Sequence, residues 1–518
     1  MQSKKINFII IGAAIFSFLL LVSAAKTKSL TYDEPTFIAS GYSYLDHKEI
    51  KLNPEAPPFL QALVAFPLKF LNLKSPDYSH SNYAAERQIA FAQMFLEHNR
   101  DKLGDITFLS RMPVHLLFFM LVIMVGFFVK TQAGALPAIA ASALVALSPN
   151  LIAHGQLATT DFGCAVFMFI SVYTFYLAIR SNGYKRWLIC GLVTGLALLS
   201  KFTALLLAPI FFTFVLYEIL LNDRNKTEVF RGLLLLVFII LLVICVGYGF
   251  KPWLYLYGIS KIYNVGKIDY QQYLFGNVFS EPVWYYYFAA FLVKTPVSTL
   301  LLIIFSVYET LRLRPDRDTV VYFLTPVGIT MFVCCFDLTN LGLRRILPVY
   351  PFLLSYVSIV YFYSKPNRLK TIIFAALLTS NIIVTLIAYP HYISYFNIPA
   401  GGAINGPNLL DDSNIDWGQD LLALAEWQKY NSPEEPINLM YFGSMNPELY
   451  GLYFRPMPRH ELIKPSKGIY AISTHYLIYT RKLAYWNNKH IDWLKLYEPI
   501  DYVGNSIYIY QFSHKPDD

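Results

Sequence analysis

The apolar residues of this chain fall into long blocks that are separated by short polar breaks. A helix needs roughly 20 mostly apolar residues to cross the hydrocarbon core of a bilayer. We therefore predict an all-α polytopic membrane protein with eleven spanning helices, two of which are short. The predicted spans are 8–25, 112–130, 133–149, 162–180, 187–200, 203–221, 232–250, 284–310, 319–336, 346–363 and 371–389.

The composition agrees with a membrane protein. The chain is 55% hydrophobic and 15% charged, and its mean hydropathy is +0.42, whereas a soluble domain averages about 25% charged residues. All five cysteines lie inside predicted spans. We therefore expect no disulfide framework outside the membrane and no activity based on thiols or a thiol-bound metal.

Lysine and arginine residues gather in every second predicted loop. Because cytoplasmic loops carry an excess of these residues, the pattern places the N-terminus in the cytoplasm and the long loop 26–111 outside. The net charge of +8 then reflects topology, and a nucleic-acid-binding surface is the weaker interpretation. A signal peptide cleaved near Ala25 is an alternative to the first span.

Two parts of the chain lie outside the spans. Loop 26–111 is long enough to carry function, and it contains one predicted interfacial helix near 57–71 and a more polar one at 83–99. After the predicted transmembrane domain 1–395, we expect a soluble extracytoplasmic α/β domain over 396–518. Its predicted elements are a helix at 421–427 and strands at 437–442, 468–473 and 506–512.

An acidic pair, Asp33 and Glu34, follows the first predicted span after about eight residues. A carboxylate held close to the membrane surface can act on a lipid-linked substrate whose polar head lies at the same depth. The alternative is that the pair caps a helix beside the membrane. Asp161 lies at the predicted outer end of span 162–180, on the same side as Asp33, and ionisable residues at such positions are usually functional.

Several motifs in one order along the chain resemble those of the bacterial GT-C glycosyltransferases that use polyprenyl-phosphate sugars. This group is related to the protein mannosyltransferases and the aminoarabinose transferases of lipid A, and the resemblance extends over residues 1 to about 450. Each motif alone is loose, but their ordered coincidence is specific. The motifs are YDEP at 32–35, LNPEAPP at 52–58, SPNLIAHG at 148–155, TTD at 159–161, KF at 201–202, KTP at 294–296, GLRRILPVYPF at 342–352 and DSNIDWGQD at 412–420.

The resemblance implies a GT-C fold and a sugar transfer in which Asp33 is the general base and Glu34 supports it. A single base and a direct displacement imply inversion at the anomeric carbon. The resemblance also implies that Asp161 binds the acceptor or a divalent ion (Mg, Mn or Zn). His154 and Glu55 are candidates for the same site, although a histidine in a loop is more often only hydrogen-bonded or solvated.

The phosphate of the donor needs cations, and three basic residues lie where the positive-inside rule disfavours them: Lys201, Arg344 and Arg345. Snorkelling to outer lipid headgroups is the alternative. Many relatives have His or Lys directly before the paired prolines, where this chain has Ala56. That departure leaves a phosphate contact from loop 26–111 in doubt.

Trp417 lies in a polar segment, where it could stack on a sugar or anchor the C-terminal domain. The expected partners are a polyprenyl-phosphate sugar donor, membrane lipids and a glycolipid, polysaccharide or protein acceptor, at the outer face of the bacterial cytoplasmic membrane. A transporter or flippase for lipid-linked saccharides is the alternative function. Transporters tend to have internal repeats and charges at the midplane, whereas here no repeat is found and the charges gather at one face.

Overall fold

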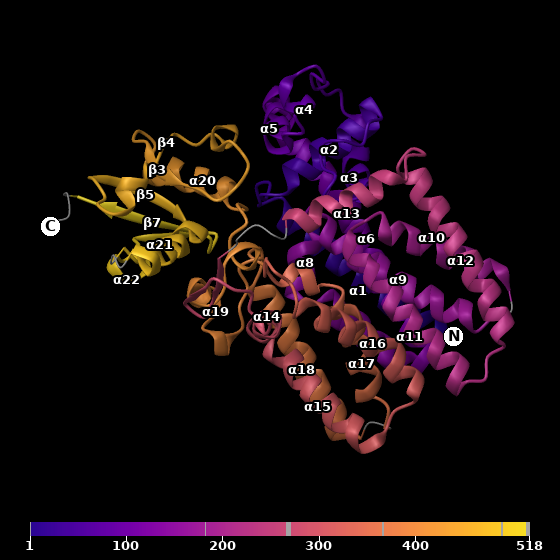
Figure 1. Cartoon of the computed structure of the whole chain (residues 1–518). Helices are drawn as coiled ribbons and strands as arrows, with labels where there is room; N and C mark the ends of the chain where they lie inside the picture. The colour runs from indigo at the N-terminus through magenta and orange to yellow at the C-terminus, as the bar shows by residue number, and fades with distance from the viewer. Residues whose placement is uncertain (1, 182, 266–270, 365–366, 488–490, 514–518) are drawn as a thin grey trace.

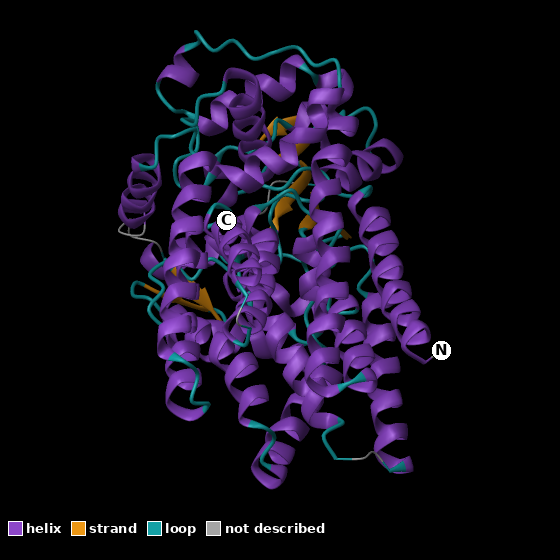
Figure 2. Cartoon of the chain, turned by 90° about the vertical axis from the view of Figure 1, so that its right-hand side faces the viewer, coloured by secondary structure: helices purple, strands orange, loops and turns teal. Residues whose placement is uncertain are grey.

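Long apolar helices form one part of the protein, and a lobe built on a five-stranded sheet lies at one end of them (Figure 1). The computed structural model describes residues 2–181, 183–265, 271–364, 367–487 and 491–513. Helices account for most of these residues, as the colouring in Figure 2 shows. The predicted fold class, a helical membrane protein with a small α/β part at its C-terminus, is therefore confirmed.

Among the described residues, seven helical segments are long and apolar enough to cross a membrane, and nine if each of two bent pairs counts as one span. The bent pairs are α7 (Ala135–Ala146) with α8 (Pro149–Gly155), at 59°, and α14 (Tyr286–Lys294) with α15 (Val297–Leu313), at 117°. The seven segments contain α1 (Gln2–Ala25), α6 (Leu103–Ala133), α9 (Thr160–Ile179), α11 (Leu207–Leu221), α12 (Lys226–Gly247), α16 (Arg317–Cys334) and α18 (Arg368–Ile387).

Each of the eleven predicted spans contains a helix, but two of these helices belong to no segment or bent pair of spanning length. They are α10 (Tyr184–Leu198), with 15 residues, and α17 (Val349–Tyr361), with 13. Almost every residue of α17 is buried, so its apolar run reflects packing inside the bundle. Both bends occur at a proline, Pro149 or Pro296. Proline has no backbone N–H to donate to the preceding helix, so it interrupts that helix and is suited to the start of the next one.

Loop 26–111 folds into short helices at the end of the bundle that also carries Asp33, called here the Asp33 end. The predicted interfacial helix corresponds to α3 (Pro58–Ala65) and the 3-10 helix η1 (Phe66–Phe70). Gly41 lets α2 (Glu34–His47) cross α3 closely, because a Cβ there would lie 1.8 Å from the Gln61 carbonyl oxygen. The predicted helix 83–99 is divided into α4 (Ser81–Ala84) and α5 (Gln88–His98).

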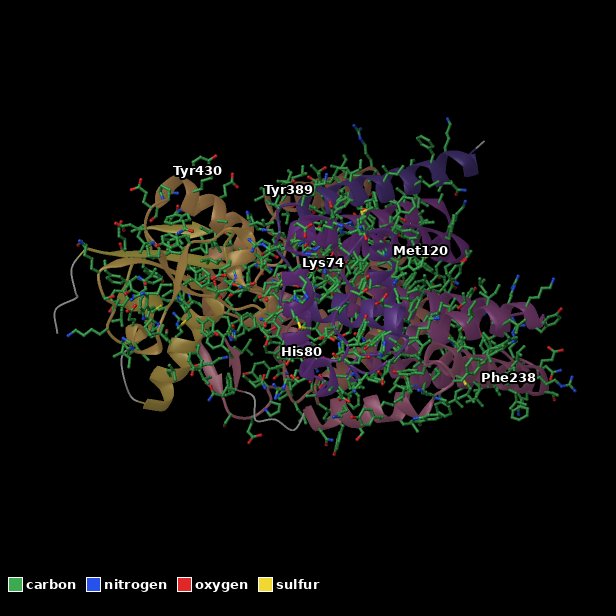
Figure 3. All side chains as sticks on the ribbon, turned by 90° about the horizontal axis from the view of Figure 1, so that it is seen from above. Lys74, His80, Met120, Phe238, Tyr389 and Tyr430 are labelled. Atoms are coloured by element: carbon green, nitrogen blue, oxygen red, sulfur yellow. The ribbon has the colours of Figure 1, made fainter. Side chains whose placement is uncertain are left out.

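The C-terminal lobe contains a mixed sheet with strand order β4-β3-β5-β7-β6, in which β3 is parallel to β4 and β5 while β7 is antiparallel to β5 and β6. Figures 1 and 3 show it beside the bundle, with Tyr430 at its surface. All three predicted strands and the predicted helix are found. The elements are α20 (Leu421–Asn431), β3 (Ile437–Met440), β4 (Phe454–Pro456), β5 (Gly468–Ser473), α21 (Thr474–Asn487), α22 (Trp493–Leu496), β6 (Asp501–Val503) and β7 (Ile507–Phe512).

The remaining elements are short and connect helices of the bundle to one another or to the lobe. Short turns over 398–414 lie between α18 and the sheet, so the division of the chain at residue 396 stays a prediction. These connecting elements are α13 (Trp253–Val265), β1 (Gln272–Leu274), β2 (Asn277–Phe279), η4 (Leu343–Ile346), η5 (Ile398–Ala400), α19 (Gly402–Asn405), η6 (Gly406–Asn408) and η7 (Asp412–Asn414).

The segment before Asp33 is bound to the start of the lobe by backbone hydrogen bonds. The N–H of Ser29 donates to the carbonyl of Gln419 at 3.0 Å, and the N–H of Tyr32 donates to the carbonyl of Trp417 at 2.8 Å. A buried ion pair between Lys28 and Asp420, at 2.7 Å, reinforces the contact. The residues after position 410 therefore help to fix the position of the acidic pair.

Candidate active site

Asp33 directly precedes the first residue of α2, and its side chain is paired with Arg344. Nη1 of Arg344 donates to Oδ2 of Asp33 at 2.7 Å. The Asp33 side chain makes no hydrogen bond to the N-terminus of α2, so the interpretation as a helix cap is wrong. Gly342 directs η4 into this position with φ +93°, a conformation that favours glycine, and a Cβ there would lie 2.4 Å from Ser413 Oγ.

Arg344 is the centre of a cluster of carboxylates. Its guanidinium nitrogens lie 3.9 Å from Asp161 and 3.9 Å from Asp412, in addition to the shorter contact with Asp33. The guanidinium also lies over the ring of Trp417, 4.3 Å from its centroid. One cation thus faces three acids from three distant parts of the chain.

Lys201 completes the cluster by pairing with Asp161. Its Nζ donates to Oδ1 of Asp161, which lies buried in the first turn of α9. The Lys201 side chain is 29% exposed, so it can meet a ligand while holding the acid. Of the residues predicted for the site, the structure therefore brings together Asp33, Asp161, Lys201 and Arg344 at one end of the bundle.

The surroundings of Asp33 change its protonation. The side chain is 30% exposed, but the protein around it still desolvates the carboxylate. Burial raises the pKa of Asp33, Arg344 opposes that effect, and the charges of Asp161 and Asp412 add to it. The net result is a pKa above the usual aspartate range, which makes this carboxylate a stronger base than an exposed one.

Glu34 points away from Asp33 and is completely buried. Its carboxylate accepts hydrogen bonds from Arg111 at 2.7 and 2.8 Å, from the N–H of Thr31 at 2.8 Å and from the N–H of Ala158 at 2.8 Å. Arg111 also donates to the carbonyls of residues 25, 28 and 29. Glu34 therefore holds the preceding segment in place and does not share a ligand with Asp33.

Arg111 was not predicted, although the sequence carried a signal for it. It directly precedes the predicted span 112–130 on the outer side, where the positive-inside rule disfavours a cation. Asp412, the third acid beside Arg344, was also missed as a site residue. It has φ +59°, an unusual conformation for a residue other than glycine.

Two predicted site residues have other partners. Arg345 forms an ion pair with Asp337 at 2.7 Å, and Asp337 also accepts a hydrogen bond from Tyr287. Arg345 is therefore separated from the acid cluster. Trp417 is only 1% exposed, because Arg344 covers its ring and His154 packs against it at 6.0 Å. Its burial contradicts stacking on a sugar and favours the alternative prediction, an anchor for the C-terminal part.

The described residues do not fit a divalent metal. No group of three or more His, Cys, Asp or Glu side chains among them is arranged to hold an ion, and Asp33 and Asp161 are already bound by cations. His154 is buried against Trp417. Glu55 is half-buried between α2 and α3, next to the lining of a separate cavity.

That cavity has a volume of about 570 Å³ and lies between loop 26–111 and α13. Ala56 lines it, together with three lysines (Lys48, Lys51 and Lys251) and two glutamates (Glu49 and Glu86). The centroid of the Phe202 ring, next to Lys201 in the chain, lies 5.2 Å from that of Tyr255 in α13, although neither residue lines the cavity. Neither Asp33 nor Asp161 lines it, so the cavity is separate from the acid cluster. Sequence reasoning did not identify these lysines.

Comparison with known proteins agrees with this architecture. A protein-family model described as dolichyl-phosphate-mannose-protein mannosyltransferase matches residues 102–248. No curated protein sequence matches the chain. The crystal structure of ArnT from Cupriavidus metallidurans in the apo state superposes with a TM-score of 0.51 and 11% identity, covering 98% of each chain.

Two further structures are similar at lower scores. ArnT from Cupriavidus metallidurans bound to undecaprenyl phosphate has a TM-score of 0.49 at 10% identity, over 96% of this chain and 97% of that one. The oligosaccharyltransferase of Archaeoglobus fulgidus in the apo form has a TM-score of 0.46 at 14% identity, over 87% and 60%. The chain is a polytopic membrane protein with the fold of ArnT, and its resemblance to the GT-C glycosyltransferases that use polyprenyl-phosphate donors is confirmed.

Proposed function

We propose that this protein is an inverting glycosyltransferase that moves a sugar from a polyprenyl-phosphate donor to an acceptor hydroxyl. The observation that supports it best is the Asp33 carboxylate, which is partly exposed and has one of its oxygens, Oδ2, bound by Arg344. A partly buried acid with a raised pKa next to a second acid–base pair is a typical arrangement for general base catalysis.

The reaction is a direct displacement. Asp33 accepts the proton of the acceptor hydroxyl while the acceptor oxygen bonds to the anomeric carbon. The bond from that carbon to the phosphate oxygen breaks, and its electron pair leaves with the polyprenyl phosphate. Because this leaving group is a stabilised anion, no acid is needed to protonate it, and attack from the opposite side inverts the configuration.

The cations have separate tasks in this proposal. Arg344 orients Asp33 and offsets the three neighbouring carboxylates. Lys201, which is partly exposed, faces the donor phosphate. In this proposal, Lys48, Lys51 and Lys251, which line one cavity with Ala56, supply the cation that many relatives have at the position of Ala56.

The choice of an enzyme over a transporter rests on where the charges lie. Asp33, Asp161, Lys201 and Arg344 gather at the ends of helices and not at the midplane of the bundle. We propose that this end faces the outside of the cytoplasmic membrane, because the basic loops lie at the opposite end. A glycolipid, polysaccharide or protein there supplies the acceptor.

The direct test uses the purified protein in nanodiscs with a panel of undecaprenyl-phosphate monosaccharides and a membrane extract as the source of acceptors. Release of undecaprenyl phosphate measures transfer. Asp33→Asn should reduce the rate by about 10²–10⁴-fold, because the amide cannot accept the proton. Asp105→Asn, an exposed aspartate in the first turn of α6, is the matched control and should retain full activity.

Wild-type turnover by folded Asp33→Asn protein would contradict the assignment of the base. The alternative function has its own readout. Movement of an intact fluorescent donor across proteoliposomes, with no release of undecaprenyl phosphate from any donor tested, would favour a transporter.

A further inference from the structure

A second cavity, of about 420 Å³, lies behind the segment that carries Asp33. Its walls come from the end of α1, the start of α6 and the C-terminal lobe. Arg111 and Ser29 line the cavity, and Arg111 also binds Glu34, the neighbour of Asp33 in the chain. The sugar-transfer mechanism does not use this cavity.

The charge of the cavity is positive. The basic residues that line it are Lys26, Lys28, Arg100 and Arg111, and no carboxylate is among the lining residues. Lys28 and Arg111 are neutralised by buried acids, Asp420 and Glu34. Lys26 and Arg100 have exposed side chains and form no ion pair among the described residues. Their charges are therefore available to an anion.

The cavity lies at the depth in the membrane where lipid headgroups are expected. Ala25 is the last residue of the first candidate span, and Arg111, which also lines the cavity, directly precedes the predicted span 112–130. Both span ends meet at the Asp33 end of the bundle, where α1 packs along α6. Phospholipid phosphates lie at the depth of such span ends. The other walls are apolar and include Leu103, Phe108 and Leu449.

The cavity also has free space where a side chain would normally stand. Gly104 lines it, and a Cβ added at Gly104 would meet no atom within 4 Å. Gly104 lies in the second position of α6, and it is exposed. General snorkelling of Lys26 and Arg100 would not require such a recess.

We propose that this cavity binds the phosphate headgroup of an anionic phospholipid, with Lys26 and Arg100 as its contacts and Gly104 as the opening that admits it. The bound lipid supports the segment from Ser29 to Glu34 from behind, because Ser29 and Arg111 form the wall between them. This role is independent of sugar transfer.

The test measures lipid retention by native mass spectrometry of the full chain with phosphatidylglycerol, phosphatidylcholine or inorganic phosphate. Wild-type protein should retain phosphatidylglycerol in preference to phosphatidylcholine. Lys26→Gln and Arg100→Gln should each weaken retention about 5-fold. Gly104→Leu should abolish it, because the new side chain fills the recess without a clash.

Two variants serve as controls. Gly12→Leu also fills open space, but on the exposed face of α1 away from the cavity, and Lys74→Gln removes an exposed cation elsewhere on loop 26–111. Both should retain the lipid as the wild type does. Equal retention of phosphatidylglycerol by Gly104→Leu and by the wild type would overturn the site. Competition by inorganic phosphate at the concentration of the lipid would overturn the assignment to a lipid.

Discussion

Arg344 Nη1 lies 2.7 Å from the Oδ2 atom of Asp33, although the two residues are 311 positions apart in the chain. The pair joins the segment after the first span to the turn before α17. Because Arg344 also lies 3.9 Å from Asp161 and 3.9 Å from Asp412, removing it leaves three carboxylates without a shared cation. The position of this one side chain therefore controls the charge of the whole site.

The two neighbouring arginines should behave differently. Arg344→Gln is expected to lower the rate of transfer by about 10²-fold or more, because Asp33 loses its orientation and the acids repel one another. Arg345→Gln should leave the rate nearly unchanged, since it breaks only a partly exposed pair with Asp337 worth about 0–1 kcal/mol. Release of undecaprenyl phosphate by the two purified variants measures the difference. Equal losses would show that the acid cluster is not the reacting centre.

Transfer should depend on pH through Asp33. Burial raises the pKa of this carboxyl, while Arg344 lowers it. A general base acts only when deprotonated, so activity should fall as the pH drops through a value above the usual aspartate pKa of about 3.9. Arg344→Gln removes the opposing cation and should move this acidic limb to higher pH. If the residual activity of Arg344→Gln shows its acidic limb at the same pH as the wild type, that limb belongs to a group other than Asp33.

The Glu34–Arg111 pair should contribute to the stability of the folded protein against unfolding. Both side chains are fully buried, and Glu34→Gln would leave the Arg111 charge without its carboxylate, which typically costs about 3–5 kcal/mol. The exposed Glu97→Gln is the matched control and should change the unfolding temperature little. Thermal unfolding in detergent followed by tryptophan fluorescence measures both variants.

The same pair should make the stability of the folded protein fall as the pH is lowered. Burial alone would raise the pKa of Glu34, but Arg111 and the N–H groups of Thr31 and Ala158 hold it below its usual value. A carboxyl with a lowered pKa contributes stability above its unfolded pKa of about 4.3 and loses it as the pH falls through the folded pKa. The acidic loss of stability should therefore be weaker in Glu34→Gln.

Much of this architecture could be predicted because hydropathy and charge are local signals. Each apolar block became a helix, and the acids and bases at predicted outer ends met at one end of the bundle. Which of Arg344 and Arg345 faces Asp33 could not be predicted, because adjacent residues in a 3-10 turn point in different directions and only Gly342 and its tertiary contacts fix the turn. The burial of Trp417 likewise depends on long-range packing.

The alternative that Asp161 binds a divalent ion can be tested by removing such ions. Asp33 and Asp161 are each bound by a basic side chain, so an ion would have to displace Arg344 or Lys201 to reach them. We therefore expect transfer to be unchanged after treatment with EDTA and dialysis. Loss of activity that Mg²⁺, Mn²⁺ or Zn²⁺ restores would mean that the cluster rearranges around an ion when substrate binds.

The orientation of the protein decides which substrates can reach the site. Tyr430 is 74% exposed on the C-terminal lobe (Figure 3), and Lys185 is exposed in the first turn of α10, beside a predicted basic loop. A membrane-impermeant maleimide should label Tyr430→Cys in intact spheroplasts and Lys185→Cys only after permeabilisation, because basic loops stay in the cytoplasm.

The native cysteines allow this measurement. Cys164, Cys190 and Cys334 are buried, and the partly exposed Cys245 and Cys335 lie at the apolar helices, so labelling of the wild-type protein gives the background. Labelling of Lys185→Cys alone in intact spheroplasts would place Asp33 and the lobe in the cytoplasm. The acceptor would then be a cytoplasmic molecule, and transfer to a surface glycan would be excluded. Equal labelling of both variants would contradict the predicted number of crossings between Arg180 and the lobe.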